Sequence, residues 1–287
     1  MIITICIVSC KADEEITSGL LEKNINSLVQ TFTLDLDATG NQVTFETDAG
    51  SEFRFSKTGF TENGAAVSGI IEIDIIEIFD KGSMAITGKH TMTDDSILIS
   101  GGELFIRAYK SDNELDYDFT YRVEVPSNQS GNYSIKMQLF TGGENLNSSQ
   151  DWVSAPNISD TWGVFGQTDS SSYSLNLTGF GWFNCDRFYN DTRPLTELDI
   201  LIPNQFDNDN SIVYLAIKGE QSSLGIATKG KYPIGLDVHL IFSAESEDQF
   251  LYQIISGQVS EDEYKFDRDK MQLVNSDELK GIINGLE

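Results

Sequence analysis

The feature that most constrains the fold is a period-two alternation of apolar and polar residues, which recurs along the chain after residue 30. Residues 31–36, 103–110 and 120–125 each place an apolar side chain at every second position. This pattern is typical of strands with one buried face, and turn-forming pairs such as Asn63-Gly64 and Gly101-Gly102 separate the runs. Short strands at this spacing predict an all-β fold of antiparallel sheets, arranged as a sandwich or a barrel.

The longest strand signal is GIIEIDIIEIF at residues 69–79. Its isoleucines keep one phase as far as Ile75 and take the opposite phase from Ile76, which indicates either a β-bulge or a strand buried on both faces. Its acids, Glu72, Asp74 and Glu77, are interpreted as a solvent-facing row of a sheet. The alternative interpretation is a carboxylate cluster for metal binding or acid–base catalysis.

A change of composition divides the chain. Residues 143–175 are rich in Ser, Asn and Asp, and strand-like runs resume after them. We therefore predict two antiparallel β-sandwich (Ig-like) domains, at residues 31–166 and 173–287, with a domain boundary near 166–172. The chain closes with a short helix that Ser276 is expected to cap, because an apolar stripe at helical spacing follows it.

The net charge of −26 and the three cysteines exclude several function classes. A nucleic-acid partner requires Lys and Arg to neutralise phosphates, so none is expected. Cys6 and Cys10 lie in an apolar leader, which leaves Cys185 alone in the body and excludes a disulfide framework. With His90 and His239 as the only histidines, a cysteine-based zinc site is excluded as well, and we predict no metal and no cofactor.

The first ten residues resemble an export signal. Residues 1–9 (MIITICIVS) are apolar but too short to span a bilayer, and they resemble the end of a secretory signal peptide. The run Ile7-Val8-Ser9-Cys10 resembles the lipobox of bacterial lipoproteins, which implies that Cys10 becomes the first mature residue and carries a diacylglycerol. Residues 10–30 would then form a lipidated tether, although the apolar spacing of residues 16–30 also permits a short helix. The alternative is a truncated start whose few apolar residues either carry no signal or form a first strand.

Further resemblance extends to the body of the chain. The acidic run Lys11-Ala12-Asp13-Glu14-Glu15 is similar to the surface-export signal of Bacteroidetes lipoproteins. The body itself resembles a group of uncharacterised Bacteroidetes cell-surface proteins. The stretches that carry this resemblance are 60–64 (FTENG), 67–69 (VSG), 73–79 with Glu77, Thr91, 100–103 (SGGE) and 181–186 (GWFNCD). The resemblance implies β-sandwich modules anchored in the outer membrane and facing the cell exterior, and it implies no activity.

One dense constellation, residues 180–191 (FGWFNCDRFYND), combines aromatic, amide and charged side chains. In a glycan-binding interpretation, Trp182 stacks on a sugar ring while Asn184, Asp186 and Arg187 bond its hydroxyls. In a structural interpretation, the aromatic residues fill a core and Cys185 is a small buried residue. A cysteine nucleophile is disfavoured because no histidine lies in this stretch.

Two other motifs are weaker. Residues 206–211 (FDNDNS) alternate oxygen ligands as an EF-hand loop does, but Ile212 stands where that loop needs Gly and Lys218 where it needs Glu. A hairpin turn is the preferred interpretation, with loose calcium binding as the alternative. By alternation, His239 is expected on the solvent side of its strand.

These observations favour a lipid-anchored cell-surface protein that binds or scaffolds without catalysis. Its expected partners are the membrane, through the anchor, and a glycan or an envelope protein. The alternative is a surface hydrolase with paired carboxylates, which would require two carboxyl groups about 5–9 Å apart in a cleft. A purely structural spacer is a third hypothesis.

Overall fold

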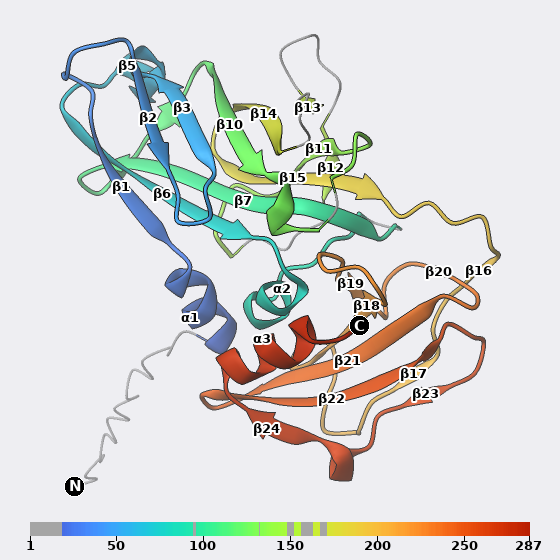
Figure 1. The fold of residues 1–287 in the computed structure, drawn as a ribbon. Coiled ribbons are helices and arrows are strands. Elements are labelled where there is room, and N and C mark those ends of the chain that lie inside the picture. Colours follow the sequence, from blue (N-terminus) through green and yellow to red (C-terminus); the bar gives the residue numbers. More distant parts are fainter. Residues whose placement is uncertain (1–18, 94–95, 132, 148–151, 156–162, 167–170) are drawn as a thin grey trace, which may run out of the picture.

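The computed structural model describes residues 19–93, 96–131, 133–147, 152–155, 163–166 and 171–287. Strands, nearly all of them antiparallel, are the main regular structure (Figure 1), and the short helices α1 (Leu20–Ser27), α2 (Lys81–Thr87) and α3 (Ser276–Asn284) accompany them. No helix in the described ranges combines the length and hydropathy needed to cross a bilayer. Cys10 and the acidic run 11–15 lie outside the described residues.

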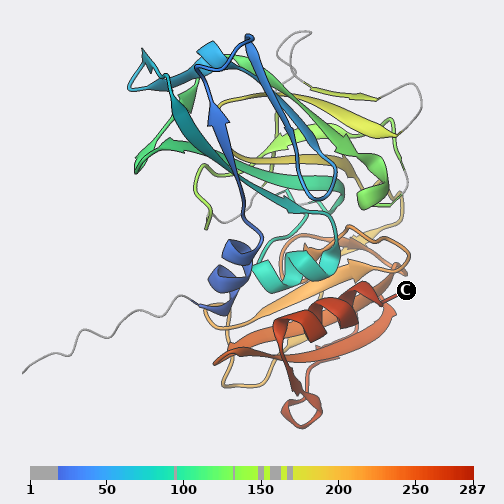
Figure 2. The same cartoon turned by 60° about the vertical axis from the view of Figure 1, so that its left-hand side comes forward.

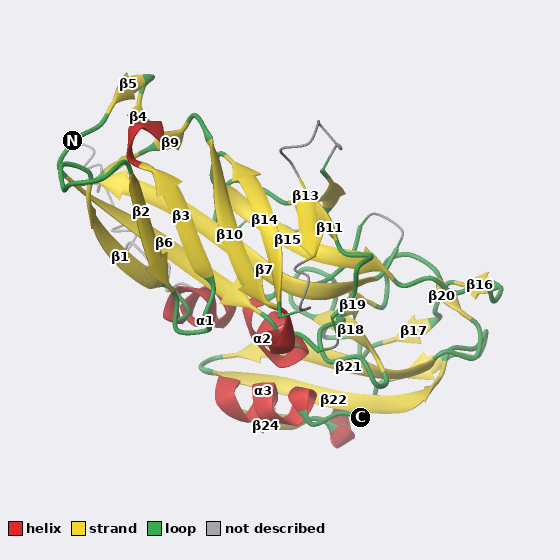
Figure 3. Ribbon diagram, turned by 45° about the horizontal axis from the view of Figure 1, so that its top comes forward, coloured by secondary structure: helices red, strands yellow, loops and turns green. Residues whose placement is uncertain are grey.

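Two sheets pack face to face in the first part of the molecule (Figure 3). Sheet A has the order β1 (Gln30–Asp35), β6 (Ile70–Ile78), β7 (Leu98–Lys110), β15 (Gly181–Phe188), β11 (Gln138–Thr141) and β12 (Val153–Ser154), and β8 (Asn113–Glu114) pairs with β7. Sheet B has the order β13 (Gly163–Gly166), β14 (Ser172–Thr178), β10 (Thr120–Pro126), β3 (Glu52–Ser56) and β2 (Gln42–Glu46). A small sheet of β5 (Ala65–Ala66), β4 (Phe60–Glu62) and β9 (Asp116–Tyr117) closes one end. The core between sheets A and B includes Phe53, Phe55, Ile73, Ile106, Val123 and Leu175.

Strand β6 is buried on both faces. Its first isoleucines, Ile71 to Ile75, pack in the core with sheet B, whereas Ile76 and Ile78 pack on the opposite face. Its pairing with β7 is unbroken from Glu72 to Ile78, so the change of phase reflects double burial rather than a bulge. The expected solvent-facing acid row is wrong for Asp74, which is buried and accepts hydrogen bonds from Thr31, Arg107 and Tyr109.

The second part of the molecule is built on one larger sheet. Sheet C has the order β19 (Gly225–Ile226), β18 (Ile212–Ile217), β21 (Asp237–Ser246), β22 (Gln249–Gln258) and β24 (Gln272–Val274). Two strand pairs accompany it: β16 (Leu195–Thr196) with β20 (Tyr232–Pro233), and β17 (Ile200–Leu201) with β23 (Tyr264–Lys265). The last pair is parallel.

The three helices form a layer between sheets A and C (Figure 2). Leu20 and Ile25 of α1, Met84 of α2 and Leu279 and Ile283 of α3 share one apolar core with both sheets. The opposite face of sheet C has its own core, which includes Val213, Leu240, Phe242, Tyr232 and Phe266. Burying these apolar surfaces on both sides holds the sandwich and sheet C together through the helices.

The predicted fold class is confirmed only in its general form. The fold is mostly β, with antiparallel sheets and a short C-terminal helix, but a division into two Ig-like sandwiches is not confirmed, since helices cover one face of sheet C. The boundary expected near 166–172 is misplaced, because β14 pairs with β10 and β15 pairs with β7. The polar composition there marks a connection between strands of one sandwich, and the chain leaves that sandwich only after Phe188.

Candidate functional site

A glycine bulge gathers polar side chains on one face of sheet A. Asn184 of β15 lies opposite Glu103 of β7, and Asp186 lies opposite Ser100. Between these two pairs β15 has one residue and β7 has two glycines, which is the arrangement of a β-bulge. The four polar residues therefore share a face: Ser100 donates its hydroxyl proton to Asn184 Oδ1 at 2.9 Å, and Asn184 Nδ2 donates to Asp186 Oδ2 at 2.7 Å.

The second glycine of the bulge, Gly102, is required there by its backbone and by the space around it. Its φ of +142° is in the region that favours glycine, and a Cβ atom would lie 2.5 Å from the ring of Phe79. The pair Gly101-Gly102 was expected to mark a turn between strands. It lies instead within β7, which continues through the bulge.

Glu103 is the member of this cluster whose carboxylate lacks hydrogen bonds in the described chain. It is fully buried, and neither carboxylate oxygen has a hydrogen-bond partner within the described part of the chain. Burial raises the pKa of the Glu103 carboxyl well above its usual range, and the nearby Asp186 adds to that rise. Burial also raises the pKa of Asp186, and the hydrogen bond from Asn184 acts against that rise. The site therefore favours the protonated form of both carboxyl groups.

Lys89 lies on the same side of sheet A. Its Nζ atom donates to the carbonyl of Leu146 at 3.1 Å and lies 4.4 Å from the centre of the Trp182 ring. Burial lowers the pKa of Lys89 to about 8, an effect that the charge of Glu103 partly offsets. The cluster thus combines two buried acids with one buried base, each shifted towards its neutral form.

The structure places most of the predicted glycan-binding residues in the interior. Trp182 is 1% exposed, packs against Phe105 with ring centres 5.1 Å apart, and directs its indole N–H at the carbonyls of Asn145 and Leu146. Asn184 and Asp186 are fully buried. Arg187 is partly exposed and lies 3.5 Å from Glu220. A sugar cannot stack on Trp182 or reach the two buried residues without opening the fold, so direct glycan contact by these three residues is wrong.

Cys185 has its side chain in the core between sheets A and B. It is fully buried, and burial raises the pKa of its thiol well above the usual range, an effect to which Asp186 contributes. A thiolate is the nucleophilic form of cysteine, so this environment opposes nucleophilic chemistry. The structural interpretation of residues 180–191 accounts for their positions.

The expectation for His239 was also wrong. His239 is buried, with Nδ1 2.7 Å from the Ser256 hydroxyl and Nε2 2.9 Å from the carbonyl oxygen of Glu287. The residues that follow α3 cover this part of the strand, which alternation alone does not reveal. Within the described ranges, no group of three or more His, Cys, Asp or Glu residues is arranged to hold a metal ion.

Ser222 and Ser223, which lie between β18 and β19 of sheet C, bind the first residues of β7 close to the cluster. The hydroxyl of Ser222 is within hydrogen-bond distance of the carbonyls of Ser100 (2.6 Å) and Ser130 (2.9 Å), and the Ser100 N–H donates to the Ser222 carbonyl. Ser223 Oγ donates to the Leu98 carbonyl at 2.9 Å. These bonds, all buried, help to hold the two parts of the molecule in a fixed relation.

An accessible cavity of about 730 Å³ lies where α1 and the end of α2 meet sheet C. Apolar side chains make up much of its wall: Leu21, Ile200, Ile202, Ile212, Ile226 and Phe250. Polar groups also line it, among them Asn208, Asp209, Asn210, Ser211, Thr228 and Glu245. Neither Glu103 nor Asp186 lines this cavity, so the carboxyl groups with shifted pKa values and the accessible space are in different places.

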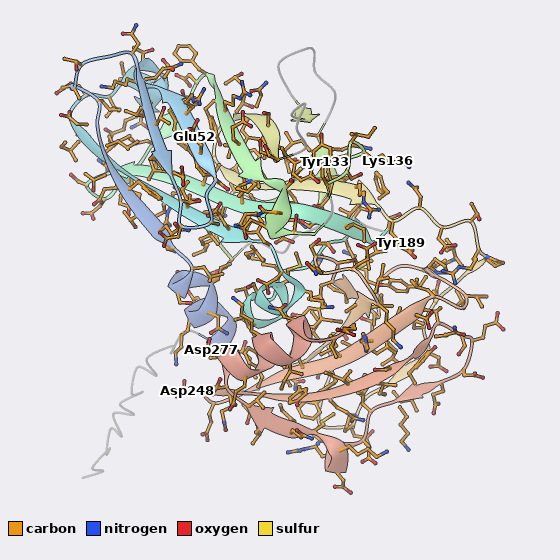
Figure 4. The ribbon with its side chains drawn as sticks, in the orientation of Figure 1. Glu52, Tyr133, Lys136, Tyr189, Asp248 and Asp277 are labelled. Atoms are coloured by element: carbon orange, nitrogen blue, oxygen red, sulfur yellow. The ribbon has the colours of Figure 1, made fainter. Side chains whose placement is uncertain are left out.

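The end of the β21–β22 hairpin and the segment 206–211 form the polar side of this cavity. Glu245, at the end of β21, accepts the backbone N–H of Leu20 at 2.6 Å, and Lys23 pairs with Asp248 at the tip of the β21–β22 hairpin (Figure 4). The 206–211 segment, expected to be a hairpin turn, joins β17 to β18, and its Asp207 accepts the N–H of Asp209. Helix α1 is thereby fixed beside the cavity, and its Leu21 forms part of the wall.

A second, shallow cavity of about 510 Å³ lies on sheet B. Both arginines that line it are already paired with carboxylates, Arg54 with Glu52 and Arg122 with Glu124. This pairing leaves the larger cavity as the better candidate for a binding site.

The cavity is not evident from the sequence, although the polar segment 206–211 that lines one side of it is. No family model, curated protein or solved structure was found to match the chain.

Proposed function

We propose that the chain is a lipid-anchored protein of the outer membrane that faces the cell exterior and binds a small ligand without transforming it. The cavity between the helices and sheet C is the observation that carries the binding function. It has the size and the mixture of apolar wall and polar groups that are usual for small-molecule sites, and it lies between two parts of the molecule, where such sites are common. The anchor is supported by the lipobox-like run that ends at Cys10.

The described cavity lining supports binding rather than catalysis. Among the described residues that line it, there is no histidine, cysteine or lysine to serve as a base or nucleophile. Its titratable groups are Asp209, Tyr214 and Glu245, and the hydroxyl of Tyr214 is buried and bonded to the carbonyl of Ala85. The alternative, a surface hydrolase, would use Asp209 and Glu245 as its paired carboxylates.

The anchor is tested by replacing the lipidated residue. Cys10→Ala should abolish metabolic labelling with palmitate and move the protein from the detergent phase to the aqueous phase. Cys6→Ala is the matched control and should leave both unchanged. Palmitate on the Cys10→Ala protein, or none on the wild type in its own host, would overturn the anchor.

Binding at the cavity is tested by blocking it. Thr228 is exposed and lines the cavity, so Thr228→Trp should narrow it without disturbing a core. Ligands found by a thermal-shift screen and a glycan array should bind the wild type and lose at least tenfold affinity for this variant. Thr192→Trp, an exposed position outside the lining, is the control. A ligand that is consumed during the assay, with loss of turnover in Asp209→Asn or Glu245→Gln, would favour the hydrolase.

A further inference from the structure

We infer that the cavity selects an aliphatic cation, a molecule with an apolar chain and an ammonium group at one end, and that Glu245 binds the ammonium. This inference rests on the proposed use of the cavity as the ligand site. It names a chemical class that the proposed function leaves open. Two independent features of the lining lead to it.

The first feature is the apolar wall. Leu21 from α1, Ile212 from β18 and Phe250 from β22 line the space together with Ile200, Ile202 and Ile226. These side chains are aliphatic except for Phe250, and a flexible hydrocarbon chain matches such a surface because burial of apolar area is non-directional. Tryptophan, the usual platform for sugar rings, is not among the described lining residues.

The second feature is the sign of the charge. Asp209 and Glu245 are the charged residues among the described lining, and both are acidic. A carboxylate or phosphate in this cavity would face two like charges without a lysine, arginine or histidine to pair with. The net charge of −26 adds a general attraction for cations, so the whole protein raises the local concentration of such ligands.

Glu245 is the better positioned of the two acids. One oxygen, Oε2, is held by the N–H of Leu20 at 2.6 Å, and the described chain supplies no other hydrogen bond or ion pair to this carboxylate. The group is therefore oriented in advance and still has acceptor capacity for an ammonium N–H. Asp209, an exposed residue of segment 206–211, lines the same cavity from the loop side.

The test compares three ligands with the same chain: octylammonium, octanol and octanoate, each measured by calorimetry below its aggregation concentration at pH 7. We expect octylammonium to bind at least tenfold more tightly than octanol, and octanoate to bind most weakly. Glu245→Gln keeps an oxygen that can accept the Leu20 N–H, so the fold should persist. This variant should bind octylammonium about as weakly as octanol, while its affinity for octanol is unchanged.

Glu247→Gln is the matched control, because it removes the same charge two residues away at an exposed position outside the lining. It should retain the preference for octylammonium within about twofold. Equal affinity for the ammonium and the alcohol, or an equal loss in both Glu→Gln variants, would overturn the inference.

The blocking variant separates this inference from the proposed function. If all three ligands bind equally and Thr228→Trp removes them, the cavity is a binding site but does not select cations. If the glycan and thermal-shift screens give ligands that Thr228→Trp removes while octylammonium does not bind, the function stands and the ligand class is wrong. If no ligand responds to Thr228→Trp, both fail.

Discussion

Asn184 lies directly opposite Glu103 across the β7–β15 pair, and its amide bridges Ser100 and Asp186 while the two oxygens of Glu103 lack partners in the described chain. A buried carboxyl group without partners is costly to ionise, and this cost appears as a raised pKa for Glu103. The two residues therefore have different roles. Asn184 holds the cluster together through its hydrogen bonds, and Glu103 makes the stability of the folded protein depend on pH.

The pH dependence has a definite sign. Folded Glu103 keeps its proton to a higher pH than the unfolded chain does, and Asp186 acts in the same direction. Their contribution is complete below the unfolded pKa values, near 4, and decreases as pH rises towards the folded values. Glu103→Gln cannot ionise, so its free energy of unfolding should exceed that of the wild type at pH 8, by about 1 kcal/mol or more, the usual size for a change at a buried charge. The two proteins should be nearly equal at pH 4.5.

Urea unfolding at pH 4.5, 6 and 8 measures this difference. Glu263→Gln, at an exposed position, is the control and should follow the wild type throughout. A Glu103→Gln effect of the same size at every pH would show that ionisation of Glu103 does not limit stability.

Trp182 should contribute to stability rather than to ligand contact. Its ring is buried against Phe105 and Lys89, so Trp182→Ala should lower the free energy of unfolding by about 3–5 kcal/mol. Phe119→Ala, at a half-exposed ring, should cost about 0.5 kcal/mol or less. Unchanged unfolding of Trp182→Ala together with loss of a glycan-array signal would restore the glycan-binding interpretation of residues 180–191.

The alternation of apolar and polar residues predicted the strands well. It also predicted which side chains are buried wherever one face of a strand packs in a core and the other face is exposed to solvent. The double burial of β6 was one of two interpretations of the Ile75–Ile76 phase change, because both faces of that strand meet apolar layers. The C-terminal helix was placed within one residue: Asn275, not Ser276, caps it, with Glu278 completing a capping box. These features depend on near neighbours in the chain, which is why they can be predicted from it.

Features set by distant segments were not predictable. His239 and Asp74 were assigned to solvent because their strands alternate, yet groups from distant parts of the chain cover or bond them. Helix α2 went unnoticed among strands, although Asp80 caps it by accepting the Ser83 N–H and Gly88 ends it in the left-handed region. The cavity forms only where α1 contacts sheet C, and these two elements are about 190 residues apart in the chain. No local sequence pattern predicts that contact.

The glycine bulge should be intolerant of any side chain. Gly102→Ala would require a Cβ 2.5 Å from the Phe79 ring at a positive φ, so it should destabilise the fold by about 2 kcal/mol or more. Gly257→Ala, in strand β22 with open space around its Cβ, should change the free energy of unfolding by less than about 1 kcal/mol. Thermal unfolding of the two variants measures the contrast, and equal melting temperatures would mean that the bulge adapts readily.

Cys185 should be unreactive until the sandwich opens. Its thiol is buried in the core between sheets A and B, and its raised pKa keeps the thiolate scarce at neutral pH. Iodoacetamide followed by peptide mass mapping distinguishes it from Cys6 and Cys10. We expect labelling of Cys185 to rise at least a hundredfold in denaturing urea relative to buffer at pH 7.5. The exposed hydroxyl position Thr192, changed to Cys, provides a reference for an accessible thiol in the same molecule. Labelling of Cys185 at a rate similar to that of Thr192→Cys in the native protein would contradict its burial and reopen the case for a reactive cysteine.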